Sequence, residues 1–313
     1  MRAMARSRGP IIGVVLFGCL LASACAPQGG PRSSHLTTYS GATYKTDFTF
    51  DDAPSAAVAL GDKALKAKNY SVALKQYEEA SKDPNEKVQA SALNRMGELY
   101  ERGLGVRQDW TRSFDLYQKA AILGNPYGQA NSANCLFFGL GTDRNLTEAF
   151  HWAQLGAGGN VPMAINQAGW QLRNGMGVSV DTAEARRQYE KSAALGDATG
   201  EAQLGWLYAH IEPIDYQLAM TWYKKAADQN DDSAENNIGY LYEHGLGVAK
   251  DYGQAASWYQ AAAAKDFPRA QFHLGSLYDL GRGVARDPAR ARELIQKAAD
   301  GGDEEAGRWL SAH

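Results

Sequence analysis

The chain has 313 residues, 44% of them hydrophobic, and a formal net charge of −3 from 32 basic and 35 acidic residues. This composition is typical of a folded protein, and it lacks the basic excess that nucleic-acid binding requires. The three cysteines, Cys19, Cys25 and Cys135, are too few for a disulfide framework or a four-cysteine metal site.

The N-terminal segment predicts the export signal of a bacterial lipoprotein. Residues 1–10 carry three arginines and no acid, and residues 11–24 form an apolar run too short to span a bilayer as a mature helix. The letters LASAC at 21–25 resemble the bacterial lipobox, whose cysteine becomes the acylated N-terminus of the mature protein. We therefore expect a signal peptide over 1–24 and lipidation of Cys25, with acyl chains that hold the protein on a membrane.

Two other interpretations of this segment stay open. Cys19 is a rival acylation site after a shorter apolar run, and residues 22–24 also form an ordinary small-residue cleavage site, which would give plain secretion. The lipoprotein resemblance, with Ala26 after the cysteine, implies a lipid anchor in the outer membrane of the cell envelope, facing the periplasm. Residues 25–55 are rich in Gly, Pro, Ser and Thr and predict a flexible tether.

Residues 56–89 predict a helical hairpin at the start of the folded part. Alanines and tyrosines return there at helical spacing, among them Ala64, Tyr70, Ala73 and Tyr77. The hairpin lacks the glycine turn described below and resembles a plain tetratricopeptide unit. We expect it to cap the N-terminal end of the array that follows, because each repeat of an array buries its apolar face only on its neighbours.

A glycine turn of the form G-x-G returns at intervals of 36 residues, with one interval of 70 where a copy has lost two residues. Glycine supplies the positive φ of such a turn and lets two backbones approach closely. The turns begin at Gly103, Gly139, Gly175, Gly245 and Gly281.

Capping residues recur in step with this turn and predict a second helix in each copy. Asp or Asn precedes this helix, where its side-chain oxygen accepts an orphan backbone N–H, and Gly, Asn or Asp ends it in a left-handed cap. The predicted N-caps are Asp109, Asn145, Asp181, Asp215, Asp251 and Asp287. The predicted ends are Gly124, Asn160, Gly196, Asn230, Asp266 and Gly302.

We call positions that recur in each repeat columns. These columns resemble those of the Sel1-like repeat family, a relative of the tetratricopeptide repeat, and match the family's pattern best at residues 234–266. The resemblance implies an all-α fold: an α/α solenoid of antiparallel helix pairs, with about six Sel1-like repeats over 90–302. Residues 303–313 form half a repeat and predict a C-terminal capping helix. In the copy at 198–230, residues 209–214 replace the glycine turn, which predicts a shorter and stiffer connection.

The sequence contains no constellation typical of catalysis or cofactor binding. The recurring G-x-G follows helices rather than strands and lacks the third glycine of a dinucleotide site. His210 and His244 share a column, but packed helices lie about 8–10 Å apart, too far for the two to share one zinc ion. Cys135 stands in a leucine column, which predicts a buried, unreactive thiol. We expect no catalytic residue, no metal ligand, no cofactor and no enzymatic activity.

A candidate partner-binding surface lies on the first helices of the repeats, which usually line the concave face of such solenoids. Two columns three residues apart share one helix face there. The aromatic column contains Trp170, Trp206 and Tyr240, the amide column contains Gln167, Gln203 and Asn237, and partner-facing His210 and His244 belong to the same surface. Aromatic residues dominate binding hot spots, and amides beside them suit a peptide backbone or a sugar chain. The competing interpretation is that the aromatic residues are inter-repeat core.

The leading functional hypothesis is a non-enzymatic scaffold lipoprotein that holds a protein, or a polysaccharide-assembly complex, in the envelope. It rests on resemblance to Sel1-repeat lipoproteins of secretion and exopolysaccharide systems. One alternative is a secreted effector that acts on a host protein. A less favoured one is a hydrolase of cell-wall or β-lactam substrates, because the paired cysteines of the family members proposed to act on penicillins are missing here.

Overall fold

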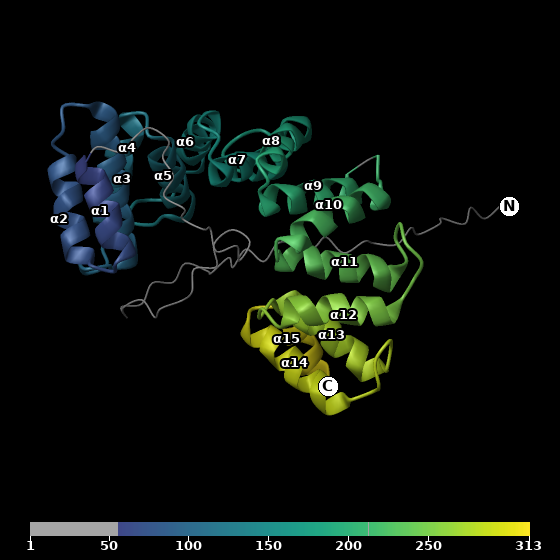
Figure 1. Cartoon of the computed structure of the whole chain (residues 1–313). Helices are drawn as coiled ribbons and strands as arrows, with labels where there is room; N and C mark the ends of the chain where they lie inside the picture. The colour runs from purple at the N-terminus through teal and green to yellow at the C-terminus, as the bar shows by residue number, and fades with distance from the viewer. Residues whose placement is uncertain (1–55, 212) are drawn as a thin grey trace. The chain divides into compact units, whose positions relative to one another are not determined.

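The computed structural model describes residues 56–211 and 213–313, and every regular element in these ranges is an α-helix (Figure 1). The predicted signal peptide at 1–24, Cys25 and the tether at 25–55 lie outside the described residues. The described chain falls into two units, residues 56–250 and residues 251–313. No described helix has both the length and the apolar character that crossing a bilayer requires.

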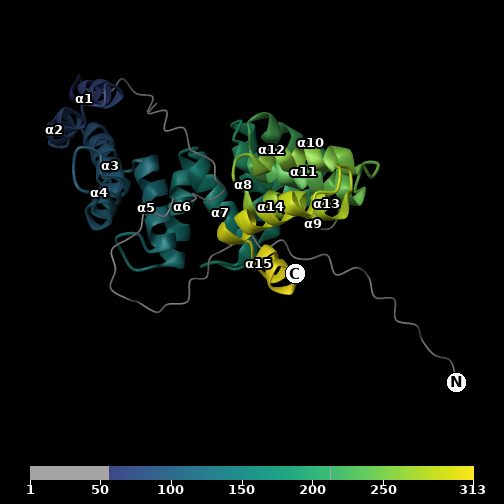
Figure 2. The same cartoon turned by 90° about the horizontal axis from the view of Figure 1, so that it is seen from below.

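Eleven helices make up the described part of the first unit. They are α1 (Ala56–Lys66), α2 (Tyr70–Ala80), α3 (Glu86–Arg102), α4 (Trp110–Ile122), α5 (Pro126–Phe138), α6 (Leu146–Gly158), α7 (Pro162–Asn174), α8 (Thr182–Ala194), α9 (Ala198–His210), α10 (Tyr216–Asp228) and α11 (Asp232–His244). Each packs against the next along the chain, so the unit is a run of helical hairpins (Figures 1 and 2). The predicted all-α solenoid is confirmed.

The second helices of the hairpins begin at the predicted caps. The Asp109 side chain accepts a hydrogen bond from the backbone N–H of Arg112 at 2.9 Å, and Asp181 accepts one from Glu184 at 2.9 Å. Each bond satisfies one backbone donor that the first turn of a helix leaves without a partner. Four further second helices are capped in the same way, by Asn145, Asp215, Asp251 and Asp287.

The glycine turn serves both the end of one helix and the contact with the preceding hairpin. Gly103 ends α3 with φ of 63°, and Gly105 has φ of 71°, values that favour glycine. A β-carbon on Gly105 would also come within 2.7 Å of the Cβ of Tyr70, at the start of α2. The copy without this turn behaves differently, because α9 ends at Ile211 in an extended conformation with φ of −114°.

Buried tyrosines on the second helices fill the space inside the hairpins. Tyr117 and Tyr223 are at most 1% exposed, and each ring lies against a glycine of the first helix, Gly97 and Gly205 respectively. A β-carbon on either glycine would approach the tyrosine ring to 2.6 Å, closer than real β-carbons come. The glycine column is therefore required by packing.

The first helices of neighbouring repeats contact one another, from α3 to α5, α7, α9 and α11, whereas no pair of second helices in the unit does so to a comparable extent. The first helices therefore lie on the shorter path through the stack, which is the inside of its curve. We call the surface that residues 162–174, 198–210 and 232–244 present on this side the inner surface.

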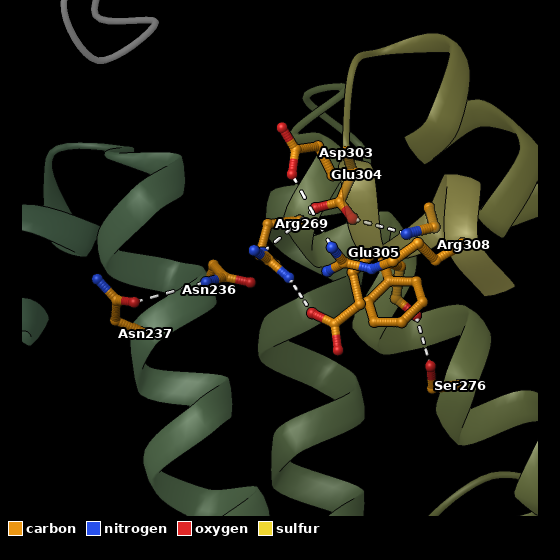
Figure 3. A network of polar contacts seen from close by, with 10 residues as sticks. Asn236, Asn237, Arg269, Ser276, Asp303, Glu304, Glu305 and Arg308 are labelled. Carbon is orange, nitrogen blue, oxygen red and sulfur yellow. Dashed lines mark hydrogen bonds and ion pairs between the residues drawn. The ribbon is translucent and has the colours of Figure 1, made fainter. Parts of the chain in front are cut away.

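The second unit contains α12 (Tyr252–Ala263), α13 (Pro268–Leu280), α14 (Pro288–Asp300) and α15 (Glu304–Ala312). Arg269 on α13 holds the start of α15 through Asp303, at 3.2 Å, and through Glu305 (Figure 3). Ala306 on α15 is fully buried in a cluster with Phe272 and Ile295. The last helix thus covers the end of the α13–α14 pair.

Candidate partner-binding surface

The predicted aromatic and amide columns lie on α7, α9 and α11, within the first unit. Because α7 contacts α9 and α9 contacts α11, the two columns follow one continuous surface. The structure therefore places the eight predicted residues on three neighbouring first helices, but it gives them different surroundings.

The two glutamines of the amide column are buried and link neighbouring first helices. Gln167 is 4% exposed and donates a hydrogen bond to the carbonyl oxygen of Ala133 at 3.1 Å. Gln203 is 3% exposed and accepts one from Arg173 at 2.8 Å. Asn237 is half-buried and accepts a hydrogen bond from Asn236 at 3.5 Å. Only Asn237 of this column keeps appreciable surface toward solvent.

Trp170 packs between two repeats. It is 8% exposed, and its ring meets that of Phe137 edge to face, with the ring centres 5.5 Å apart. An edge-to-face pair of this kind adds about 0.5–1.5 kcal/mol to the burial of both rings. In the structure, Trp170 therefore contributes more to the contact between α5 and α7 than to accessible surface.

Trp206 is half-buried and lies in a group of four side chains, Arg173, Gln203, Trp206 and His210, which we call the Arg173 cluster. The Arg173 guanidinium lies 4.1 Å from the centre of the Trp206 ring. The His210 ring stacks on Trp206 with centres 4.6 Å apart and an angle of 12° between planes. Cation–π and stacking contacts hold the indole in one orientation.

Tyr240 and His244 repeat the aromatic–histidine pair one repeat later. Their ring centres are 4.0 Å apart, and the rings are inclined by 27°. In both pairs the histidine Nδ1 faces the carbonyl oxygen of the aromatic residue four positions earlier, at 2.9 Å in His210 and 3.1 Å in His244. Because a carbonyl oxygen only accepts hydrogen bonds, Nδ1 carries the hydrogen in both rings. His244 is exposed, so this pair presents a polar edge to solvent.

The Arg173 cluster carries one positive charge rather than two at neutral pH. Burial lowers the pKa of His210, the hydrogen bond to the Trp206 carbonyl opposes this shift, and the charge of Arg173 adds to it. His210 is therefore neutral near pH 7.

Arg173 is the residue that the sequence analysis missed. It stands four residues after the glycine of its first helix, where the other copies carry Glu101, Phe137, Ala209, Glu243 and Asp279. Among the six copies, only this one has a basic residue at the position, and this departure from the repeat pattern could have identified Arg173 from the sequence.

The described residues contain no group of three or more His, Cys, Asp or Glu side chains that could hold a metal ion. Cys135 is 2% exposed, and burial raises the pKa of its thiol. The predicted burial of this cysteine is confirmed, and a thiol in such surroundings is a poor nucleophile.

Comparison with known families matches most of the folded chain to one repeat type. The family described as Sel1 repeat matches residues 90–125, 126–160, 162–197, 198–231, 232–267 and 268–303. Six copies are found, in agreement with the sequence analysis. No curated protein matches the chain.

Two solved structures are similar to this chain over most of its length. One is a protective antigen of uropathogenic Escherichia coli with an SLR fold, 28% identical, with a TM-score of 0.62 over 82% of this chain and 56% of that one. The other is a Sel1 repeat protein from Oxalobacter formigenes, 26% identical, with a TM-score of 0.71 over 77% of this chain and 96% of that one. This chain thus covers little more than half of the E. coli antigen.

Proposed function

This chain belongs to the Sel1 repeat family, and we propose that it is a non-enzymatic scaffold whose inner surface binds a protein partner. Sel1-repeat proteins generally mediate protein–protein interactions. The observation that carries the proposal is the pair of stacked side chains in consecutive repeats, Trp206 with His210 and Tyr240 with His244.

These pairs suit a binding surface for an energetic reason. Each aromatic ring keeps exposed surface while its neighbours already restrict its rotamers. Binding then freezes little side-chain motion, so more of the contact energy appears as affinity. The buried glutamines and Trp170 support this surface from below by joining α5, α7 and α9.

A site-specific crosslink tests the inner surface. Benzoylphenylalanine replaces His244, which is exposed on α11, and in a control it replaces Lys224, which is exposed on the second helix α10. Irradiation of intact cells should give a discrete protein adduct from position 244 and none from position 224. Adducts of equal yield from both positions, or an adduct that proteases leave intact and glycosidases remove, would contradict a protein partner on this surface.

We further propose that the scaffold works in the bacterial envelope, anchored by lipid on Cys25. Support comes from the basic, apolar and small-residue segments of residues 1–25. Mass spectrometry of the mature protein should find an acylated N-terminal Cys25, and Cys25→Ser should release the protein from membranes. Cys19→Ser is the matched control and should leave the anchor intact. A mature protein that starts elsewhere and is soluble in wild type would support secretion of a released effector instead.

A further inference from the structure

Buried tyrosines recur in the hairpins, and the first two use carboxylates of this chain as hydrogen-bond acceptors. The Tyr77 hydroxyl donates to Asp62 at 2.7 Å, and the Tyr117 hydroxyl donates to Glu101. Both tyrosines are 0% exposed. A phenol that is shielded from water needs such an acceptor, because a buried donor without one is destabilising.

Tyr189 and Tyr223 occupy the corresponding place in the third and fourth repeats, at 0% and 1% exposure. No described residue accepts a hydrogen bond from either hydroxyl, and the same holds for the indole N–H of Trp206. Three buried donors in adjoining repeats therefore lack an acceptor in the part of the chain that the structure describes. Such groups are uncommon in folded proteins and call for an explanation.

The sequence explains why the acceptor is missing. Glu101 stands four residues after Gly97, whereas Arg173 stands four residues after Gly169. In the fourth repeat the same place is occupied by Ala209. The chain has thus replaced the carboxylate that a buried tyrosine would use by a cation in one copy and by a methyl group in the next.

Arg173 brings positive charge to these donors. Its guanidinium lies 4.1 Å from the Trp206 ring and donates to Gln203 at 2.8 Å. It also lies near enough to both phenols to favour their ionised forms, although burial dominates and raises the pKa of Tyr189 to about 12. Arg173 and Trp206 keep some exposed surface, so a ligand meets these two residues first. A cation beside buried hydrogen-bond donors is complementary to a carboxylate.

We propose that the Arg173 cluster, with the hydroxyls of Tyr189 and Tyr223, receives the carboxylate of an Asp or Glu side chain from an extended segment of the partner protein. The site lies in the middle of the inner surface, with α5 on one side and α11 on the other. An extended segment can therefore continue past the site in both directions, which favours a side chain over a chain terminus. This inference rests on the proposed function, since it names the partner chemistry of the same surface.

Peptide pools of defined composition test this proposal on the full-length protein. Each pool holds nine-residue peptides with both ends capped and a fixed central residue, Glu in one pool and Gln in the other, while the flanking positions vary among Ala, Ser, Leu and Tyr. A third pool has central Gln and a free C-terminal carboxylate. Retention on immobilised protein is measured by mass spectrometry. The Glu pool should be retained at least tenfold better than the Gln pool.

Variants connect this preference to the named residues. Arg173→Gln should abolish the preference for Glu, and Tyr189→Phe with Tyr223→Phe should reduce it several-fold while the protein stays folded. Tyr77→Phe is the matched control, since its hydroxyl already has Asp62 as acceptor, and it should leave the preference unchanged. Circular dichroism confirms that each variant has the wild-type helix content.

Four outcomes would overturn the inference. They are equal retention of the Glu and Gln pools, no retention of either, better retention of the pool with a free C-terminus, and a Glu preference that survives Arg173→Gln in folded protein. A crosslink from position 244 obtained together with any of them would leave the protein-binding scaffold standing. In that case the carboxylate site alone would be rejected.

Discussion

Gly97 on α3 lies against the ring of Tyr117 on α4, so closely that a β-carbon at position 97 would come within 2.6 Å of ring atom Cε1. Tyr117 is fully buried. We predict that Gly97→Ala lowers the free energy of unfolding by about 1–3 kcal/mol, the usual effect of overpacking a core. Urea denaturation followed by circular dichroism measures the change.

Gly307 on α15 provides the control for this substitution. It is helical, and a β-carbon there would meet no atom within 4 Å. Gly307→Ala should leave stability unchanged or raise it by up to about 1 kcal/mol, because alanine favours helix over glycine. A Gly97→Ala protein as stable as wild type would contradict the packing role of the glycine column.

The hydrogen bond that Asp181 accepts at the N-terminus of α8 should stabilise this helix independently of the charge on the side chain. Asp181 is exposed and accepts a hydrogen bond from the backbone N–H of Glu184 at 2.9 Å. We predict that Asp181→Ala costs about 1 kcal/mol of stability and that Asp181→Asn costs at most a few tenths, since asparagine caps helices about as well as aspartate. The two variants are compared by thermal unfolding. Equal losses would mean that the charge, rather than the cap bond, stabilises α8.

The half-buried carboxyl of Glu98 should make stability depend on pH. Burial raises its pKa to about 8; Arg95, Arg102 and the hydrogen bond from Asn94 oppose this shift, and Glu101 adds to it. In the unfolded chain the pKa of a glutamate is about 4.3. Between these two values the unfolded chain loses a proton that the folded chain retains, so stability falls as pH rises from about 4 to 8 and is level above.

The variant Glu98→Gln tests this sign. Glutamine keeps an oxygen for the hydrogen bond from Asn94 and carries no charge. We predict stability close to wild type at pH 4 and greater than wild type at pH 8, measured by urea denaturation at both values. A variant that is less stable than wild type at pH 8 would contradict the raised pKa.

Tyrosine-to-phenylalanine substitutions should have different effects on stability at different positions along the array. Tyr77→Phe removes a hydrogen bond to Asp62 at 2.7 Å and should lower the free energy of unfolding by about 1.5–3 kcal/mol, as expected for a bond to a charged group. Tyr223→Phe removes a buried donor without an acceptor among the described residues and should leave stability unchanged or raise it. Similar losses in both variants, compared by thermal unfolding, would show that the Tyr223 hydroxyl has an acceptor in the free protein.

The sequence by itself determined the helices and their ends. Asp181 begins α8, Gly139 ends α5 with φ of 73°, and Asn160 takes φ of 59° after α6, as their residue types predict. These features follow from the backbone of a few adjoining residues, and their return at a fixed interval predicted the stack of hairpins. The same regularity placed Trp206 and Tyr240 on one surface.

Only the tertiary structure decided what each position in a column does. Trp170 and Trp206 hold the same place in successive repeats, yet the first packs on Phe137 and the second lies beneath Arg173 with surface still exposed. Likewise, Tyr117 has Glu101 as its acceptor and Tyr189 has none among the described residues. Exposure and hydrogen bonding depend on the side chains that neighbouring helices bring to a position. These contacts join residues far apart in the chain, which no local pattern specifies.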